Sequence, residues 1–364
     1  MRKWMIISAF IPVAVFSQDN KKNTGRLDSL FQTYFKVNEP GGAVLIVKNG
    51  KEVYKNGFGL ADIKTKEPIT PQTLFNVGSV TKTFVAYGIL KLASEKKLSL
   101  TDDLYKYFPD FKNKEIAQQV KIYHLLTHTS GLPDSRKVDE QRDFYLTAKD
   151  PENWQPIKQT DTFEFLPGTK YKYSNPAFNG LALIIEKVSG KKWQDYIAEI
   201  IFKPAGMKRS TITDGPHPES GVSHGYELKE NKDPITIGFV ELDYGEEPTF
   251  AAAGNGGVWS SVEELWKYEQ AIQKNIFLNK LWIDSSRTIF TQMNWQANTP
   301  SVLGLSWFIT NESGNRMIGH TGSQGGFRAD YVWMPDSKTF YVLLTNTPKP
   351  LGEIRKKVFS ILNN

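Results

Sequence analysis

The sequence has no cysteine among its 364 residues. That absence excludes disulfide bonds as a source of stability and a thiol as a nucleophile, and it leaves histidine and the carboxylates as the strong metal ligands. Stability must therefore come from packing. Hydrophobic residues make up 40% of the chain and charged residues 23%, the composition of a globular protein that can bury a substantial core.

Beyond its N-terminus the chain also lacks any apolar run long enough to span a membrane. Met1-Arg2-Lys3 and the short apolar stretch from Trp4 to Phe16 have the pattern of a secretory signal peptide, so we expect residues 1–17 to be removed by cleavage after Ser17. A buried N-terminal helix is the alternative interpretation. Export predicts a periplasmic or secreted protein of residues 18–364 that has no stable membrane anchor.

A concentrated charge of one sign is missing too. The formal net charge is +6, and it falls by two, to +4, once Arg2 and Lys3 leave with the signal peptide. This small net positive charge is spread along the chain and does not predict nucleic-acid binding, which requires a concentrated basic face. We expect a small-molecule or peptide substrate as the partner, and the sequence predicts no particular oligomeric state.

The chain is longer than one hydrophobic core usually supports, and strands are expected near both of its ends. The β-rich runs Gly42–Lys48 and Lys51–Phe58 are joined by Asn49-Gly50, the strongest short-range signal for a hairpin. Helices are expected at residues 24–36 and 350–362, one near each terminus. Three further strands are expected at Arg316–His320, Phe327–Met334 and Thr339–Thr345.

The middle of the chain has helical periodicity instead. Helices are expected at Lys82–Ala93, Ala117–Thr127, Phe178–Val188, Trp193–Ile201 and Val262–Gln273. We therefore predict an α+β fold in which strands from both ends form one antiparallel sheet flanked by the terminal helices. A sheet subdomain of about residues 24–78 and 300–364 would carry an inserted, mostly helical subdomain of about residues 79–275.

The pattern Ser-x-x-Lys, which can pair a nucleophile with a base, occurs three times, beginning at Ser79, Ser94 and Ser189. Ser94 lies at the polar end of a predicted helix and Ser189 in a predicted turn, so both are expected on the solvated surface. Ser79 directly precedes an apolar helix, which places Lys82 one turn further along the same face.

This placement has a chemical use, because a serine hydroxyl is a weak nucleophile until a neighbouring base takes its proton. Lys82 can be that base if burial lowers its pKa. The backbone amide of Ser79, at the positive end of a helix, can also donate to a developing oxyanion, a contribution of roughly 3 kcal/mol. An N-cap serine with a surface lysine is the alternative, and this segment alone does not decide between the two.

Two later segments favour the catalytic interpretation. Tyr173-Ser174-Asn175 lies in a predicted loop ahead of an apolar helix, and His320-Thr321-Gly322 lies at the end of a predicted strand. Neither triplet is specific alone, since Tyr54-Lys55-Asn56 also matches Tyr-x-Asn. In this order, however, Ser-x-x-Lys, Tyr-x-Asn and His-x-Gly resemble the serine β-lactamase and penicillin-binding protein superfamily, in its class C β-lactamase-like branch. The likeness runs from about residue 40 to 345 and includes the segments His124–Leu132, Phe202–Met207 and Ala252–Ser261.

The resemblance implies a β-lactamase/transpeptidase-like fold and an acyl-enzyme mechanism. Ser79 would attack a carbonyl carbon while Lys82 and Tyr173 share the proton transfers, and which of these two is the general base stays open. Tyr173 would also return a proton to the leaving group.

The resemblance further implies the residues that surround the substrate. Asn175 would hold both Lys82 and the substrate amide. The backbone amide of Ser323, next to Gly322, would be the second oxyanion donor. The cleft would lie between the sheet and the helical subdomain, with His320 on one wall.

At His320 the sequence departs from β-lactamases, which usually carry a lysine there that attracts the substrate carboxylate. A histidine is largely neutral near pH 7 and attracts less. His-x-Gly is the version seen in related esterases and D-amino-acid peptidases, so the resemblance favours esters or peptide and amide bonds as substrates. A true β-lactamase or D,D-carboxypeptidase is the alternative within the enzymes. A non-catalytic homologue that binds peptidoglycan or a partner is the alternative of another class, although its usual sign, loss of the serine, lysine or tyrosine, is absent.

His124 and His128 have the i, i+4 spacing of two metal ligands on a helix. The residue after the first is Leu125, where a zinc protease has glutamate. We expect these histidines to close a helix and its following turn, and we expect neither a metal nor a cofactor. Arg328, just beyond Gly325-Gly326-Phe327, is expected to be a solvated strand residue, with contact to an anionic substrate group as the alternative.

Overall fold

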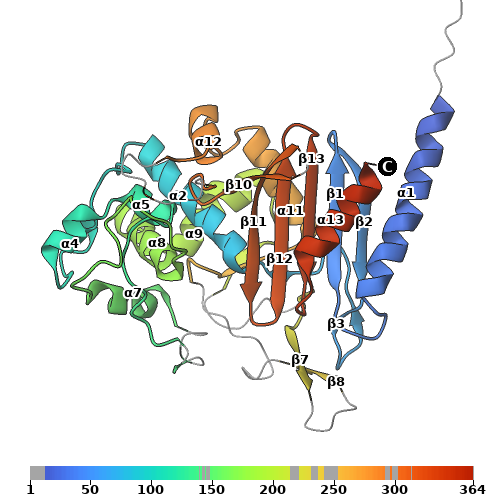
Figure 1. Ribbon diagram of the computed structural model, residues 1–364, viewed down its shortest axis with the longest axis horizontal. Helices are drawn as coiled ribbons and strands as arrows, with labels where there is room; N and C mark the ends of the chain where they lie inside the picture. Colours follow the sequence, from blue (N-terminus) through green and yellow to red (C-terminus); the bar gives the residue numbers. More distant parts are fainter. Residues whose placement is uncertain are drawn as a thin grey trace, which may run out of the picture.

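The computed structural model describes residues 13–138, 140, 141, 144, 148–213, 221–230, 237–241, 253–291, 296, 302–312 and 314–363. Both ends of the chain contribute to one six-stranded antiparallel sheet (Figure 1). Its order is β10 (Phe308–Glu312), β11 (Asn315–Gln324), β12 (Phe327–Met334), β13 (Thr339–Thr345), β1 (Gly42–Lys48) and β2 (Lys51–Phe58). β1 pairs with β13 along its whole length, so strands about 300 residues apart in sequence meet inside the sheet. The predicted fold class is confirmed.

The outer face of the sheet is covered by the two terminal helices, α1 (Val13–Tyr34) and α13 (Leu351–Leu362). α1 presents Leu27 and Phe31, spaced i, i+4, to a cluster that includes Val44 of β1 and Ile354 of α13. Figure 1 shows α1 lying along β2 at the edge of the molecule. The predicted helix from residue 24 therefore begins earlier, at Val13. Residues 1–12 of the expected signal peptide lie outside the described residues, and cleavage after Ser17 stays a prediction.

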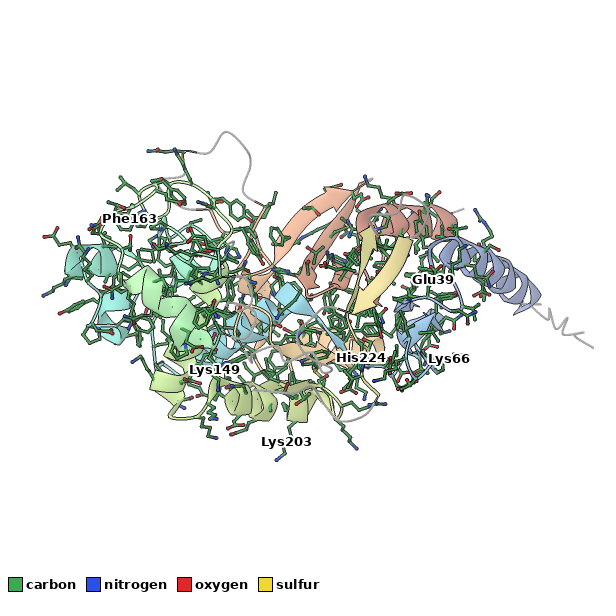
Figure 2. The ribbon with its side chains drawn as sticks, turned by 90° about the horizontal axis from the view of Figure 1, so that it is seen from below. Glu39, Lys66, Lys149, Phe163, Lys203 and His224 are labelled. Carbon is green, nitrogen blue, oxygen red and sulfur yellow. The ribbon has the colours of Figure 1, made fainter. Side chains whose placement is uncertain are left out.

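The inner face of the sheet packs against helices from the middle of the chain. α11 (Val262–Gln273) contacts β1 and β13, and α2 (Thr81–Ser94) is almost entirely buried. Figure 2 shows the two sides of the molecule from below, with Phe163 and Lys149 on the helical side and Glu39 and Lys66 on the sheet side. The remaining helices are α3 (Leu104–Tyr107), α4 (Lys114–Gln119), α5 (Ile122–Leu126), α7 (Asp150–Lys158), α8 (Asn175–Ser189), α9 (Trp193–Ile197), the π-helical η2 (Ala198–Phe202), α10 (Lys203–Ala205) and α12 (Lys280–Ser286). The subdomain boundaries stay a prediction.

Three small sheets complete the described structure. They pair β3 (Leu60–Asp62) with β4 (Glu67–Pro68), β5 (Phe75–Asn76) and β6 (Thr211–Ile212) with β9 (Val258–Ser260), and β7 (Tyr226–Glu230) with β8 (Ile237–Glu241). In the described part of the chain, no helix is both long and apolar enough to cross a membrane.

The predicted helix over residues 117–127 was wrong as a single element. α4 ends at Gln119 and α5 begins at Ile122, because Val120 and Lys121 adopt extended backbone conformations. The carbonyl of Val120 accepts a hydrogen bond from the amide of Leu104 at 3.0 Å. This tertiary bond interrupts a segment whose periodicity alone predicts continuous helix.

Three other boundaries differ from expectation. The helix expected at Trp193–Ile201 becomes π-helical from Ala198. α8 begins at Asn175, because the Ser174 hydroxyl caps it by accepting from the amide of Ala177 at 3.3 Å. β11 continues to Gln324, so His320-Thr321-Gly322 lies within the strand and not at its end.

Candidate active site

Ser79 lies in a single 3-10 turn, η1 (Gly78–Val80), that leads directly into α2. The turn is fixed to β9 from both sides. The amide of Val77 donates to the carbonyl of Val258 at 3.0 Å, and the amide of Val258 donates to the Thr81 hydroxyl at 3.0 Å. This anchoring holds the start of α2, and with it the Ser79 side chain, at a fixed place beside the sheet.

Lys82 is fully buried, and its Nζ lies 2.9 Å from the Oγ of Ser79. The same nitrogen donates to the backbone carbonyl of Asn255 at 2.7 Å. Burial in first place, and the nearby Arg136 charge in second, hold the pKa of Lys82 well below its usual value. An amine in the neutral form has a lone pair, so the geometry allows it to accept the Ser79 proton while one N–H stays on Asn255.

Tyr173 approaches the same pair from the loop before α8. The Lys82 Nζ lies 5.1 Å from the centroid of the Tyr173 ring. Burial raises the pKa of Tyr173 above its usual value, against a lowering by the neighbouring Ser79 side chain. The phenol is therefore protonated at neutral pH and placed to donate a proton.

The ring of His128 supports Tyr173 from behind. The two rings stack with centroids 4.3 Å apart, and His128 Nδ1 accepts a hydrogen bond from the amide of Ser174 at 3.0 Å. Burial, followed by the charges of Lys82 and His320, holds the pKa of His128 well below its usual value. His128 thus orients the Tyr-x-Asn segment as a neutral ring. Its sequence signals were the i, i+4 spacing with His124 and its place in the segment His124–Leu132. The Nδ1 of His124 itself accepts from the amide of Lys121.

β11 forms the opposite wall. β10 pairs with β11 only from Asn315 to Gly319, so the following residues have no β10 partner along that edge, and η1 contacts β11 there. A Cβ atom at Gly78 would lie 2.6 Å from the Ser323 amide nitrogen, and one at Gly322 would lie 2.0 Å from the carbonyl of Val77. The glycines therefore bring the Ser323 amide beside the turn that carries Ser79.

His320 is buried in this wall, with Nδ1 donating to the carbonyl of Thr321 at 2.6 Å. Burial in first place, and the Lys82 charge in second, lower the pKa of His320 to about 3. The imidazole is neutral at physiological pH and contributes no positive charge to the site.

The structure brings Ser79, Lys82, Tyr173, His320, Gly322 and Ser323 to one place. Asn175 is the first residue of α8 and follows Tyr173 by two positions. Among the described residues, the acceptors for Lys82 are Ser79 and Asn255, so a bond from Lys82 to Asn175 stays a prediction. Arg328 is half-buried and donates to its neighbour Phe327. The described residues do not gather three or more acidic or histidine side chains that could hold a metal ion.

The buried histidines predict acid sensitivity of the fold. The pKa of His124 is lowered to about 4, mainly by burial, so between pH 6.5 and 5 the unfolded chain binds a proton at this position and the folded chain does not. Stability is therefore present above pH 6.5 and is lost as the pH falls, by about 1.4 kcal/mol per pH unit for each such group.

We expect His124→Asn, which keeps an acceptor for the amide of Lys121, to lose about 2 kcal/mol less than wild type between pH 7 and pH 5. Urea unfolding at the two pH values measures the difference. The opposing titration of other groups cancels in the comparison, and equal losses would refute the assignment.

The Beta-lactamase family profile matches residues 27–361. Penicillin-binding protein 4* of Bacillus subtilis (strain 168) is 28% identical over 349 residues, which cover 90% of this chain and 72% of that protein. An octameric penicillin-binding protein homologue from Pyrococcus abyssi superposes with a TM-score of 0.78 at 28% identity, covering 93% of this chain and 77% of the other. A D-amino acid amidase from Ochrobactrum anthropi SV3 has the same fold, with a TM-score of 0.77 at 21% identity and coverage of 95% and 99%.

Proposed function

The chain belongs to the Beta-lactamase family, and on that basis we propose that it is a serine hydrolase that forms an acyl-enzyme on Ser79. The observation that carries the proposal is the contact of 2.9 Å between the Ser79 hydroxyl and the amine of a fully buried Lys82. Among the residues that the structure describes, the partners of the Lys82 amine are Ser79 and Asn255, and neither is a carboxylate. A lysine in such a place is costly to bury in its charged form, so burial is the feature that makes it a base.

In the proposed first step, Lys82 takes the proton of Ser79 as Oγ attacks a carbonyl carbon. The amides of Ser79 and Ser323 donate to the oxyanion that develops, each contributing roughly 3 kcal/mol if well placed. The lowered pKa of Lys82 supports its amine as the general base, and the raised pKa of Tyr173 supports its phenol as the general acid. Tyr173 then gives its proton to the leaving group and regains one from the Lys82 ammonium, which restores the neutral amine. In the second step a water oxygen attacks the acyl carbonyl, the bond to Ser79 Oγ breaks, and a proton of that water passes through the same two groups to Oγ.

Replacing Tyr173 with phenylalanine tests the proposed acid. We expect kcat to fall by about 100-fold or more, the usual range for loss of a general acid, with KM changed far less. The ring that stacks on His128 is retained, so the fold should be unaffected. Steady-state kinetics with a p-nitrophenyl ester measures both constants, and an unchanged kcat would remove Tyr173 from the mechanism.

We propose esters and peptide or amide bonds, including those of D-amino-acid peptides, as the substrate class. The support is the neutral His320, which offers no cation for the carboxylate that β-lactams carry. The D-amino acid amidase that shares the fold is consistent with this class.

A substrate panel tests the proposal. p-Nitrophenyl esters, D-amino-acid amides, D-Ala-D-Ala peptides and nitrocefin are offered to wild type, with Ser79→Ala as the blank. We expect cleavage of the activated esters and slow or absent turnover of nitrocefin. Nitrocefin turnover at the level of a dedicated β-lactamase would contradict the substrate class, and a panel without any Ser79-dependent cleavage would favour a non-catalytic binding protein.

We also propose that the protein is exported and cleaved after Ser17. The basic start and short apolar stretch of residues 1–16 support this. N-terminal sequencing of protein recovered outside the cytoplasm should begin at Gln18.

A further inference from the structure

The carbonyl that holds Lys82 belongs to a tightly packed turn. Asn255 lies in the segment 253–257, where the amides of Gly256 and Gly257 donate to the carbonyl of Ala253 at 3.0 and 2.8 Å. A Cβ atom at Gly254 would lie 2.5 Å from the carbonyl of Phe178 in α8, and one at Gly256 would lie 2.0 Å from the Gln324 side chain in β11. The turn therefore lies in close contact with α8 and with the Gln324 side chain of β11, so a small shift of its backbone would move the Asn255 carbonyl.

One buried carboxyl group fastens this turn to the helical side. Asp150, the first residue of α7, is 4% exposed, and its Oδ1 accepts from the amide of Gly254 at 2.8 Å. The same oxygen accepts from Nδ2 of Asn179 at 2.7 Å. Asn179 Nδ2 also donates to the side-chain oxygen of Asn255 at 3.1 Å. Asp150 thus holds the turn at two neighbouring residues. It binds the amide of Gly254 directly, and it binds the side chain of Asn255 through Asn179.

Burying a carboxyl group is costly unless it accepts hydrogen bonds, and here the donors come from the turn, from α8 and from Trp193 of α9. Burial raises the pKa of Asp150 to about 7, with the Glu186 charge on α8 also raising it and these hydrogen bonds opposing the rise. Both protonation states are therefore present near neutral pH. Oδ1 of Asp150 can accept the hydrogen bonds from Gly254 and Asn179 whether the carboxyl group is ionised or protonated. These bonds therefore do not require a negative charge on Asp150.

We propose that Asp150 is a positioning residue for Lys82, an inference that rests on the proposed function. By fixing Gly254 and Asn179, it holds the Asn255 carbonyl, and that carbonyl holds the Lys82 amine at Ser79. Asp150 touches neither substrate nor Ser79 in this assignment. Its removal frees the turn, and a misplacement of a reacting group by about 1 Å costs about 100-fold in rate.

The test compares Asp150→Ala with Asp150→Asn, which keeps the accepting oxygen. With p-nitrophenyl acetate, we expect Asp150→Ala to lower kcat by about 100-fold while KM changes by less than about threefold. Asp150→Asn should restore kcat to within about fivefold of wild type. Amide hydrogen exchange of the peptide that spans residues 253–257 should be faster in Asp150→Ala than in wild type, a readout that does not depend on activity.

Asp330 offers a matched control, because it is a buried aspartate that pairs with Arg355 of α13 on the opposite face of the sheet. Asp330→Ala should lower the unfolding temperature and leave kcat of the folded protein unchanged. If Asp150→Ala does not fold, Asn179→Ser cuts the link from α8 and should show the same fall in kcat and the same faster exchange.

The outcomes separate the two claims. Wild type that shows no Ser79-dependent cleavage of any ester, amide or peptide in the panel refutes the proposed function itself. Active wild type with undiminished kcat in Asp150→Ala refutes the positioning role alone, as does Asp150→Asn that is as impaired as Asp150→Ala. Unchanged exchange at 253–257 refutes it too.

Discussion

Replacing Ser79 with alanine is expected to lower ester turnover by about 10⁶-fold, the size of loss measured when a serine hydrolase is deprived of its nucleophile. The reason is that alanine removes the hydroxyl that lies against the Lys82 amine, whereas the oxyanion donors remain and support only residual catalysis. Purified Ser79→Ala, assayed at high enzyme concentration with a p-nitrophenyl ester, measures the loss.

The chain contains its own matched controls for this experiment. Ser94 and Ser189 also begin Ser-x-x-Lys, but their hydroxyls bond to the backbone carbonyls of Lys91 and Lys191. Ser94→Ala and Ser189→Ala should therefore keep wild-type turnover. Residual turnover of Ser79→Ala within about tenfold of wild type would mean that the nucleophile is elsewhere.

Replacing Lys82 with methionine is expected to lower turnover by about 10³-fold, within the range for loss of a general base. Methionine has a similar length and fills the buried space, and it removes an amine that is costly to bury. The free energy of unfolding should therefore stay the same or rise while kcat falls. Chemical denaturation and steady-state kinetics on the same preparation separate these effects.

Lys97 is the matching lysine of the second Ser-x-x-Lys segment, and 52% of its side chain is exposed. Lys97→Met should keep wild-type activity. Two results would contradict the role of Lys82: wild-type turnover in Lys82→Met, or a loss in Lys82→Met that is fully explained by unfolding.

The strands of the sheet could be predicted where turn residues bound a segment whose side chains favour a buried strand. Asn49 and Gly50 have φ values of 53° and 74°, the positive values that an Asn-Gly hairpin requires, and the strands on either side have their predicted bounds. β12 and β13 also match, because both are rich in aromatic and β-branched residues and end at clear turn residues. β10 was missed, since Phe308–Glu312 has a polar second half and pairs only at the sheet edge.

Only those parts of the site that are formed by side chains in recognisable sequence motifs could be predicted. The spacing of Ser79 and Lys82 on one helical turn predicted their contact, which the structure has at 2.9 Å. The carbonyl of Asn255 carries no side-chain signal and lies 173 residues from Lys82 in sequence. His128 was assigned only to a turn, because its stacking on Tyr173 depends on tertiary packing across 45 residues that no local pattern encodes.

Covalent trapping shows whether Ser79 is a nucleophile that Lys82 activates. Folded wild-type protein is treated with a fluorophosphonate, and intact mass spectrometry followed by peptide mapping locates the adduct. We expect one adduct per chain, on the peptide that contains Ser79, with none on Ser79→Ala and slow formation on Lys82→Met. Absence of an adduct on folded wild type, or an adduct that persists in Ser79→Ala, would contradict this expectation.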